Sequence, residues 1–198
     1  MKALPIQCDV TDTQQVEATV EKAVAEFGRI DVLVNNAGSS KANPVTEMTD
    51  EEWNFTIDTD LTSVFKMTRA VAKTMIDQSY GRIINIASMY GLLGTNQNAG
   101  AYHASKAGVV NFSRSSAAEL APYGITVNTI CPGYFTTELT VDTLETEDFK
   151  QYMAITVPLA RPGKAGELNA GAIFLGSEEA AYVTGVALPI DGGWSSAK

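Results

Sequence analysis

The sequence predicts an α/β fold of the Rossmann-like, doubly wound type, in which helices cover both faces of a parallel sheet. Compact apolar segments without polar alternation, such as residues 30–34, are typical of strands buried on both faces. These segments alternate with helical patterns of about ten residues or more, the order that crossover connections between parallel strands require. The 198 residues, 45% of them hydrophobic, are enough for one such domain over residues 1–198.

The first part of the chain is predicted to form a strand, a helix and a second strand. Residues 3–8 are a short apolar strand, and Thr11 caps a helix whose apolar residues recur at helical spacing. Gly28 ends that helix. Residues 30–34 form the second strand, and a loop over residues 35–38 closes it.

A long helix and two further strands are predicted in the middle of the chain. Thr49 begins a capping box with a glutamate three residues later, and apolar residues mark one side of a helix over residues 49–78. Residues 81–87 are the next strand, and residues 102–120 the next helix. Residues 125–130 form another strand before a Cys-Pro-Gly turn.

The last part of the chain begins with a segment of weak periodicity. Residues 136–162 are rich in Thr, Glu and Asp, and they are predicted to form a mobile substrate lid rather than a packed layer. A helix over residues 165–176 and a strand over residues 186–189 follow, and an Asp-Gly-Gly turn comes after them.

Composition excludes several classes of partner. The chain has 23 acidic against 14 basic residues and a formal charge of -9, so we expect neither nucleic acid nor an anionic membrane as a partner. No apolar run is long enough to span a membrane, and no signal-peptide core follows Met1. Cys8 and Cys131 lack metal-ligand spacing, and two free thiols are typical of a reducing cytosol. We therefore expect a cytoplasmic protein without a metal site.

Three predicted strands end in polar or turn residues. Asn35, Ser88 and Pro132 each follow a strand, and parallel strands place their carboxyl ends at one edge of the sheet. We therefore expect these ends to converge on one ligand-binding crevice.

Tyr102 and Lys106 stand one helical turn apart and are expected to lie on one face of their helix. A free tyrosine has a pKa of about 10, and a neighbouring ammonium favours the phenolate. Ser88, at the end of the preceding strand, can hydrogen-bond a substrate oxygen and stabilise developing charge. The three residues suit proton transfer beside a hydride carrier, with Tyr102 as acid or base, Lys106 as activator and Ser88 as polariser.

These motifs occur in one characteristic order. Asn-Asn-Ala-Gly over residues 35–38, Ser88, Tyr-His-Ala-Ser-Lys over residues 102–106, and Cys-Pro-Gly followed by Thr137 together resemble the short-chain dehydrogenase/reductase family. The resemblance extends over nearly the whole chain, and is greatest to 3-oxoacyl-carrier-protein reductases and gluconate or polyol dehydrogenases. It implies an oxidoreductase that uses NAD or NADP to interconvert a secondary alcohol and a ketone.

The resemblance also implies which residues bind the dinucleotide. One group contacts adenine or borders the cofactor: Asp9, Val10, Asn35, Ala37 and Gly38. A second group lies along the nicotinamide and its ribose: Tyr102, Lys106, Pro132, Gly133 and Thr137. The helices over residues 49–78 and 102–120 resemble those that build family dimers and tetramers, so a homo-oligomer is implied.

Asp60 departs from the family pattern. The family usually has an asparagine there, which helps to hold a water in the proton relay and completes the catalytic set. An ionised aspartate accepts hydrogen bonds but donates none. Two alternatives are open: Asp60 pairs with Lys106 and weakens its effect on Tyr102, or it still positions the water.

A second departure is that the sequence contains no Thr-Gly-x-x-x-Gly-x-Gly loop, the family element that receives the cofactor diphosphate. In the family strand order 3-2-1-4-5-6-7, residues 3–8 would be the third strand, left as an unpaired apolar edge by the lack of the first two. Three explanations are open: a fragment of a longer chain, a stable truncated form, or a partner subunit that supplies the strands. The alternative to an enzyme is a catalytically silent subunit of the same fold.

Overall fold

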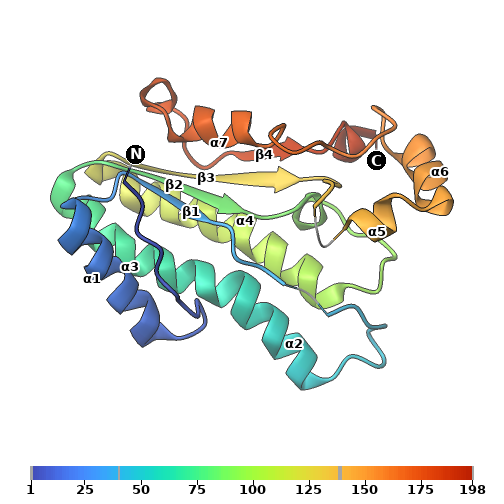
Figure 1. Ribbon diagram of the computed structural model, residues 1–198, viewed down its shortest axis with the longest axis horizontal. Helices are drawn as coiled ribbons and strands as arrows, with labels where there is room; N and C mark the ends of the chain where they lie inside the picture. Colours follow the sequence, from blue (N-terminus) through green and yellow to red (C-terminus); the bar gives the residue numbers. More distant parts are fainter. Residues whose placement is uncertain (1, 40, 138–139, 198) are drawn as a thin grey trace.

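The computed structural model describes residues 2–39, 41–137 and 140–197, and shows a parallel four-stranded sheet between two helical layers (Figure 1). Each strand pairs in parallel with the next one along the chain, in the order β1-β2-β3-β4. The strands are β1 (Val32–Asn35), β2 (Gly81–Ile86), β3 (Ile125–Pro132) and β4 (Ala187–Ile190). The predicted α/β fold class is confirmed.

Helices cover both faces of this sheet. Three long helices lie on one face: α1 (Thr13–Phe27), α3 (Ser63–Gln78) and α4 (Gly100–Leu120). On the other face lies α7 (Asn169–Gly176), which begins four residues later than the helix predicted from the sequence. Two short helices, α5 (Val141–Leu144) and α6 (Glu147–Thr156), lie beyond the carboxyl ends of the strands (Figure 1).

The hydrophobic core lies on both faces of the central strands. On one face of the sheet, Met75 of α3 packs against Ile83 of β2 and Val127 of β3, all at most 1% exposed. On the other face, Ile84 packs against Leu175 of α7, again with almost no exposure. Because alternate residues of β2 are buried on opposite faces, its polar residues need partners: Asn85 donates to the Ser113 hydroxyl, and Arg82 donates to the carbonyl oxygens of Gly81 and Ser177.

The helix caps follow the sequence closely. Thr49 accepts a hydrogen bond from the backbone of Glu52, whose side chain accepts one in return, so the predicted capping box is confirmed. Gly28 ends α1 with a φ of 78°, a left-handed conformation that glycine adopts without steric cost. At the start of α1 the cap is Asp12 rather than Thr11.

The predicted long helix over residues 49–78 is divided. It consists of α2 (Asp50–Ile57), a π-helical turn (Asp58–Thr62) and α3. The expanded turn inserts extra backbone into a continuous helix and changes the direction of its side chains. Hydrophobic periodicity did not predict this turn, which carries Asp60 into the interior.

Residues 3–8 do not form a strand, so that prediction is wrong. The sheet instead ends at β1, whose Val32 and Val34 are 42% and 46% exposed. Residues 4–7 lie beside α1, where they line a groove with Lys22 and Glu26. An extended segment becomes a strand only when a neighbouring strand takes up its hydrogen bonds, and residues 3–8 pair with no strand in the described part of the chain.

The segment over residues 136–162 contains more packed structure than its weak periodicity predicts, and its residues 138–139 lie outside the described residues. Met153 of α6 and Val157 are 2% and 3% exposed and pack with Met89 and Trp194. In residues 2–39, 41–137 and 140–197, no helix combines the length and apolarity needed to cross a bilayer.

Replacing Met75 by alanine is expected to lower the free energy of unfolding by about 2–5 kcal/mol, because a fully buried side chain leaves a cavity against Gly81 and Ile83. Urea denaturation followed by circular dichroism measures the change. The matched control is Lys73→Ala on the exposed side of the same helix, with an expected change below about 0.5 kcal/mol. Equal effects of the two substitutions would contradict this account of the core.

Candidate active site

The carboxyl ends of β1, β2 and β3 lie side by side, as predicted. Asn35 is paired with Asn85 in the β1–β2 register, and its amide donates to the Asn85 side-chain oxygen at 2.8 Å. Asn85 in turn donates to the Ser113 hydroxyl of α4 at 2.8 Å. This buried chain of hydrogen bonds joins two strands to the helix that carries Tyr102 and Lys106, and so fixes the site at the sheet edge.

Ser88 follows β2 by two residues and is 8% exposed. Its hydroxyl accepts a hydrogen bond from the backbone N–H of Tyr90 at 3.2 Å and begins a short helical turn (Met89–Gly91). At Gly91 a Cβ would lie 2.6 Å from the carbonyl oxygen of Lys106, so the turn contacts the backbone of α4 directly. This close approach brings Ser88 beside Tyr102.

Tyr102 lies beside Ser88 and next to Lys106. Burial raises the pKa of the Tyr102 phenol, and the hydrogen bond with Ser88 opposes that rise. The Lys106 ammonium lies 5.4 Å from the centre of the Tyr102 ring and donates to the carbonyl oxygen of Ile86 at 3.3 Å. The structure therefore brings together the serine, tyrosine and lysine that the sequence singled out.

Asp60 reaches the same place from the π-helical turn. Its carboxylate lies 3.4 Å from the Lys106 ammonium, and both side chains are buried. At Gly38 a Cβ would lie 3.2 Å from the Lys106 nitrogen and 3.3 Å from an oxygen of Asp60, so the loop after β1 covers the pair without a side chain. Of the two sequence-based alternatives for Asp60, the geometry shows the ion pair.

Asp9 and Val10, the residues predicted to contact adenine, precede α1, and Val10 lies near the loop that follows β1. Val10 lines a hollow of about 100 Å³ together with Asn35 and Ala37. The Asp9 carboxylate accepts hydrogen bonds from the backbone and hydroxyl of Thr11, at 2.8 and 2.7 Å, which lower the pKa of Asp9. Asp9 therefore orders the turn into α1.

The residues predicted to lie along the nicotinamide follow the end of β3. Pro132 is in register with Ile190, and at Gly133 a Cβ would lie 2.6 Å from the Cα of Asp191, so only glycine fits there. Thr137 is exposed, and its hydroxyl is 2.9 Å from that of Thr140. These positions border the site from the β3–β4 side.

A group of tyrosines beside the site was not assigned a role from the sequence. The hydroxyl groups of Tyr90 and Tyr134 are 2.7 Å apart, and that of Tyr152 on α6 is 3.4 Å from Tyr134. Tyr90 also contacts Tyr102 edge to face, with ring centres 6.2 Å apart. The signal available in the sequence was position, since Tyr90 follows Ser88 by two residues and Tyr134 directly follows Gly133.

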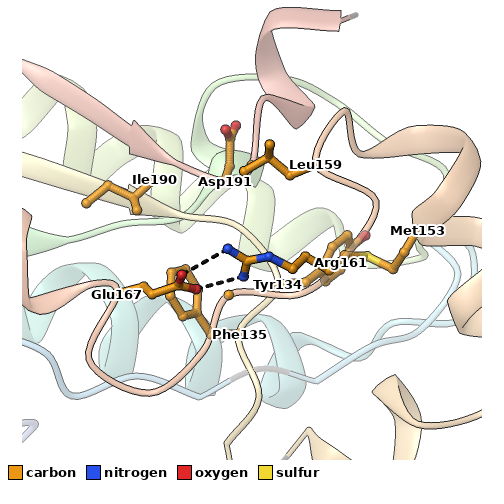
Figure 2. A pocket seen from close by; sticks show the side chains of 10 residues that line it. Tyr134, Phe135, Met153, Leu159, Arg161, Glu167, Ile190 and Asp191 are labelled. Carbon is orange, nitrogen blue, oxygen red and sulfur yellow. Dashed lines mark hydrogen bonds and ion pairs between the residues drawn. The ribbon is translucent and has the colours of Figure 1, made fainter.

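A separate cavity of about 180 Å³ lies under Tyr134 (Figure 2). Arg161 spans it and binds both carboxylate oxygens of Glu167, at 2.8 and 2.9 Å, which lowers the pKa of Glu167 to about 2. Ser88, Tyr102 and Lys106 do not line this cavity. Among the residues that the structure describes, no group of three or more His, Cys, Asp or Glu side chains could hold a metal ion.

Comparison with known proteins assigns the chain to a family. Residues 1–195 match the family model described as Enoyl-(Acyl carrier protein) reductase. The chain belongs to the short-chain dehydrogenase/reductase family. It is 43% identical over 188 residues to 3-oxoacyl-(acyl-carrier-protein) reductase FabG of Escherichia coli (strain K12), covering 95% of this chain and 76% of that protein.

Solved structures of this short-chain dehydrogenase/reductase family have the same fold. Levodione reductase superposes with a TM-score of 0.90 at 36% identity, over 96% of this chain and 76% of that one. A gluconate 5-dehydrogenase from Burkholderia cenocepacia J2315, in complex with NADP and tartrate, gives a TM-score of 0.91 at 36% identity, over 96% and 74%. The family is therefore one of oxidoreductases whose cofactor is NAD or NADP.

Gly91→Ala is expected to lower the free energy of unfolding by about 1–3 kcal/mol, because the added methyl group would overlap the carbonyl of Lys106. Thermal or urea unfolding measures this effect. Gly94→Ala is the matched control, since a Cβ there meets nothing within 4 Å. If both variants had wild-type stability, the tight contact between this turn and α4 would be refuted.

Proposed function

We propose that this protein transfers a hydride between a nicotinamide dinucleotide and a small secondary alcohol or ketone, with Tyr102 as the acid or base. The observation that carries the proposal is the position of the Tyr102 phenol beside the Ser88 hydroxyl and the buried Lys106 ammonium, which lies 5.4 Å from the ring centre. A nicotinamide dinucleotide, when bound, supplies or accepts the hydride.

The three side chains divide the proton chemistry among them. In alcohol oxidation, the Tyr102 phenolate takes the proton of the substrate hydroxyl group; in ketone reduction, the phenol returns it. Burial disfavours the phenolate, and the positive charge of Lys106, 5.4 Å from the ring centre, favours it. The Ser88 hydroxyl hydrogen-bonds the substrate oxygen as charge develops on it.

The residues present fit two parts of the dinucleotide. The hollow between Val10 and residues 33–37 is mostly apolar and suits the edge of a flat base ring. Lys106 is a donor beside Tyr102 and suits the hydroxyl groups of the nicotinamide ribose. Gly38 and Gly133 have no side chain to occupy the space at the ends of β1 and β3. The residues proposed to border the cofactor there are Asn35, Ala37, Gly38, Pro132, Gly133 and Thr137.

The proposed substrate is a ketone or alcohol bounded by aromatic side chains and by the segment over residues 136–162. Tyr90 and Tyr134 form an aromatic wall next to Tyr102, and the hydroxyl of Tyr152 connects this wall to α6. We propose that residues 136–162 act as a substrate lid, since α6 contacts the turn after Ser88 through Met89.

We also propose a homo-oligomer in the cytosol. Phe65 of α3 is 42% exposed and contacts Phe112 of α4 edge to face, with ring centres 6.3 Å apart, so an aromatic surface spans both helices. An exposed aromatic surface of this kind is typical of an interface between subunits. The cytosol is supported by two free cysteines, and burial raises the pKa of Cys131 to about 11, which keeps its thiol protonated.

Tyr102→Phe is expected to reduce alcohol oxidation and ketone reduction by about 10²-fold or more, because the proton donor and acceptor is lost. Nicotinamide absorbance measures turnover over a panel of polyols and 3-oxoacyl thioesters, with NAD and NADP in parallel. Tyr182→Phe is the control, because Tyr182 is fully exposed. Wild-type turnover in Tyr102→Phe would overturn the proposed role, and lack of binding of either cofactor in calorimetry would favour the catalytically silent subunit.

Phe65→Glu is expected to lower the molar mass of the particle in light scattering, because a charge at the aromatic surface opposes subunit contact. Val45→Glu is the control, since Val45 is 87% exposed and lies before α2. An unchanged mass for Phe65→Glu, or a monomeric wild type, would reject this interface.

A further inference from the structure

Asp60 is a fully buried carboxylate whose two oxygens have different partners. It lies in the π-helical turn between α2 and α3, and its exposure is 0%. One oxygen accepts a hydrogen bond of 2.6 Å from the backbone N–H of Ser39. The other oxygen faces the Lys106 ammonium at 3.4 Å. A buried charge in this position is costly unless a counter-charge accompanies it, and Lys106 is that counter-charge.

Lys106 is shared between two acidic groups. Its ammonium faces the Asp60 carboxylate at 3.4 Å on one side and lies 5.4 Å from the centre of the Tyr102 ring on the other. It also donates a hydrogen bond to the carbonyl oxygen of Ile86 at 3.3 Å. Side chains at 0–5% exposure interact with little screening by solvent, so a charge on Asp60 is felt at Tyr102.

We propose that Asp60 is a positioning residue that sets the pH range of the reaction by holding the Lys106 ammonium and opposing the formation of the Tyr102 phenolate. This inference rests on the proposed role of Tyr102 as acid or base. It predicts that the native site favours the protonated phenol, and hence ketone reduction, over a wider pH range than the same site without the carboxylate.

The charged and titratable groups around Tyr102 support this direction. From α4 it faces Lys106, from the turn after β2 it faces the Ser88 hydroxyl and Tyr90, and from the π-helical turn it faces Asp60. Burial is the largest cause that raises the pKa of Tyr102, and the negative charge of Asp60 raises it further. Ser88 acts in the opposite direction.

Burial and mutual attraction act in opposite directions on the two members of the pair. Burial raises the pKa of Asp60 and lowers that of Lys106, while their mutual attraction opposes both changes. The hydrogen bond from Ser39 also favours the charged carboxylate. The carboxylate of Asp60 and the ammonium of Lys106, 3.4 Å apart, therefore act on Tyr102 in opposite directions.

The test compares Asp60→Asn with wild type in the pH profile of kcat/KM for alcohol oxidation. The rising limb is expected to move to lower pH by about one unit, because the amide keeps the shape of the side chain but removes its negative charge. Asp58→Asn is the matched control: it removes the same charge from an exposed residue of the same π-helical turn, with an expected shift below about 0.3 unit. An unmoved limb in Asp60→Asn would overturn the inference.

A titration without cofactor separates this inference from the proposed function. Ultraviolet absorbance of tyrosinate, with Tyr102→Phe subtracted in each background, reports the ionisation of Tyr102 alone. An earlier ionisation in Asp60→Asn supports the inference even where no turnover is found, and an identical ionisation overturns it even where turnover is normal. Thermal unfolding verifies that the variants are folded, and Asp60→Ser repeats the charge removal in a second variant.

Discussion

Parallel pairing between β1, β2 and β3 is the constraint on which the site depends. It aligns Asn35, Asn85 and the end of β3 at one sheet edge. The hydrogen bonds from Asn35 through Asn85 to Ser113 then attach α4 to that edge. Because a parallel sheet orients all its strand ends in one direction, residues separated by 50 positions or more can act on one substrate.

The electrostatic character of the site follows from one buried ammonium. Lys106 is 4% exposed and has a carboxylate on one side and a phenol on the other. A buried cation needs a counter-charge to remain charged, and a catalytic tyrosine needs a cation to ionise near neutral pH. In the proposed reaction the same ammonium serves both purposes, so the charge available to Tyr102 depends on how strongly Asp60 holds it.

The free edge of the sheet shows how secondary structure depends on a partner. Residues 3–8 have the apolar composition of a strand, yet they lie beside α1 without ladder hydrogen bonds. β1 is apolar too, and its pairing with β2 over four residues makes it a strand. Both segments have strand-like composition, and they differ in that β1 has a neighbouring strand to pair with.

The sequence by itself determined the order of strands and helices and the types of residue at the strand ends. The capping box at Thr49, the glycine after α1 and the apolar strands are local patterns, and each was visible within a few residues. The Tyr102 and Lys106 spacing on one helix was also local. Only the tertiary structure decided the π-helical turn at Asp60, the 3.4 Å contact with Lys106 and the tyrosine hydroxyl groups beside the site. The contact of Asp60 with Lys106 and that of Tyr90 with Tyr134 each join residues about 45 positions apart in the chain. Packing between elements brings such residues together, and a local pattern of residues does not predict it.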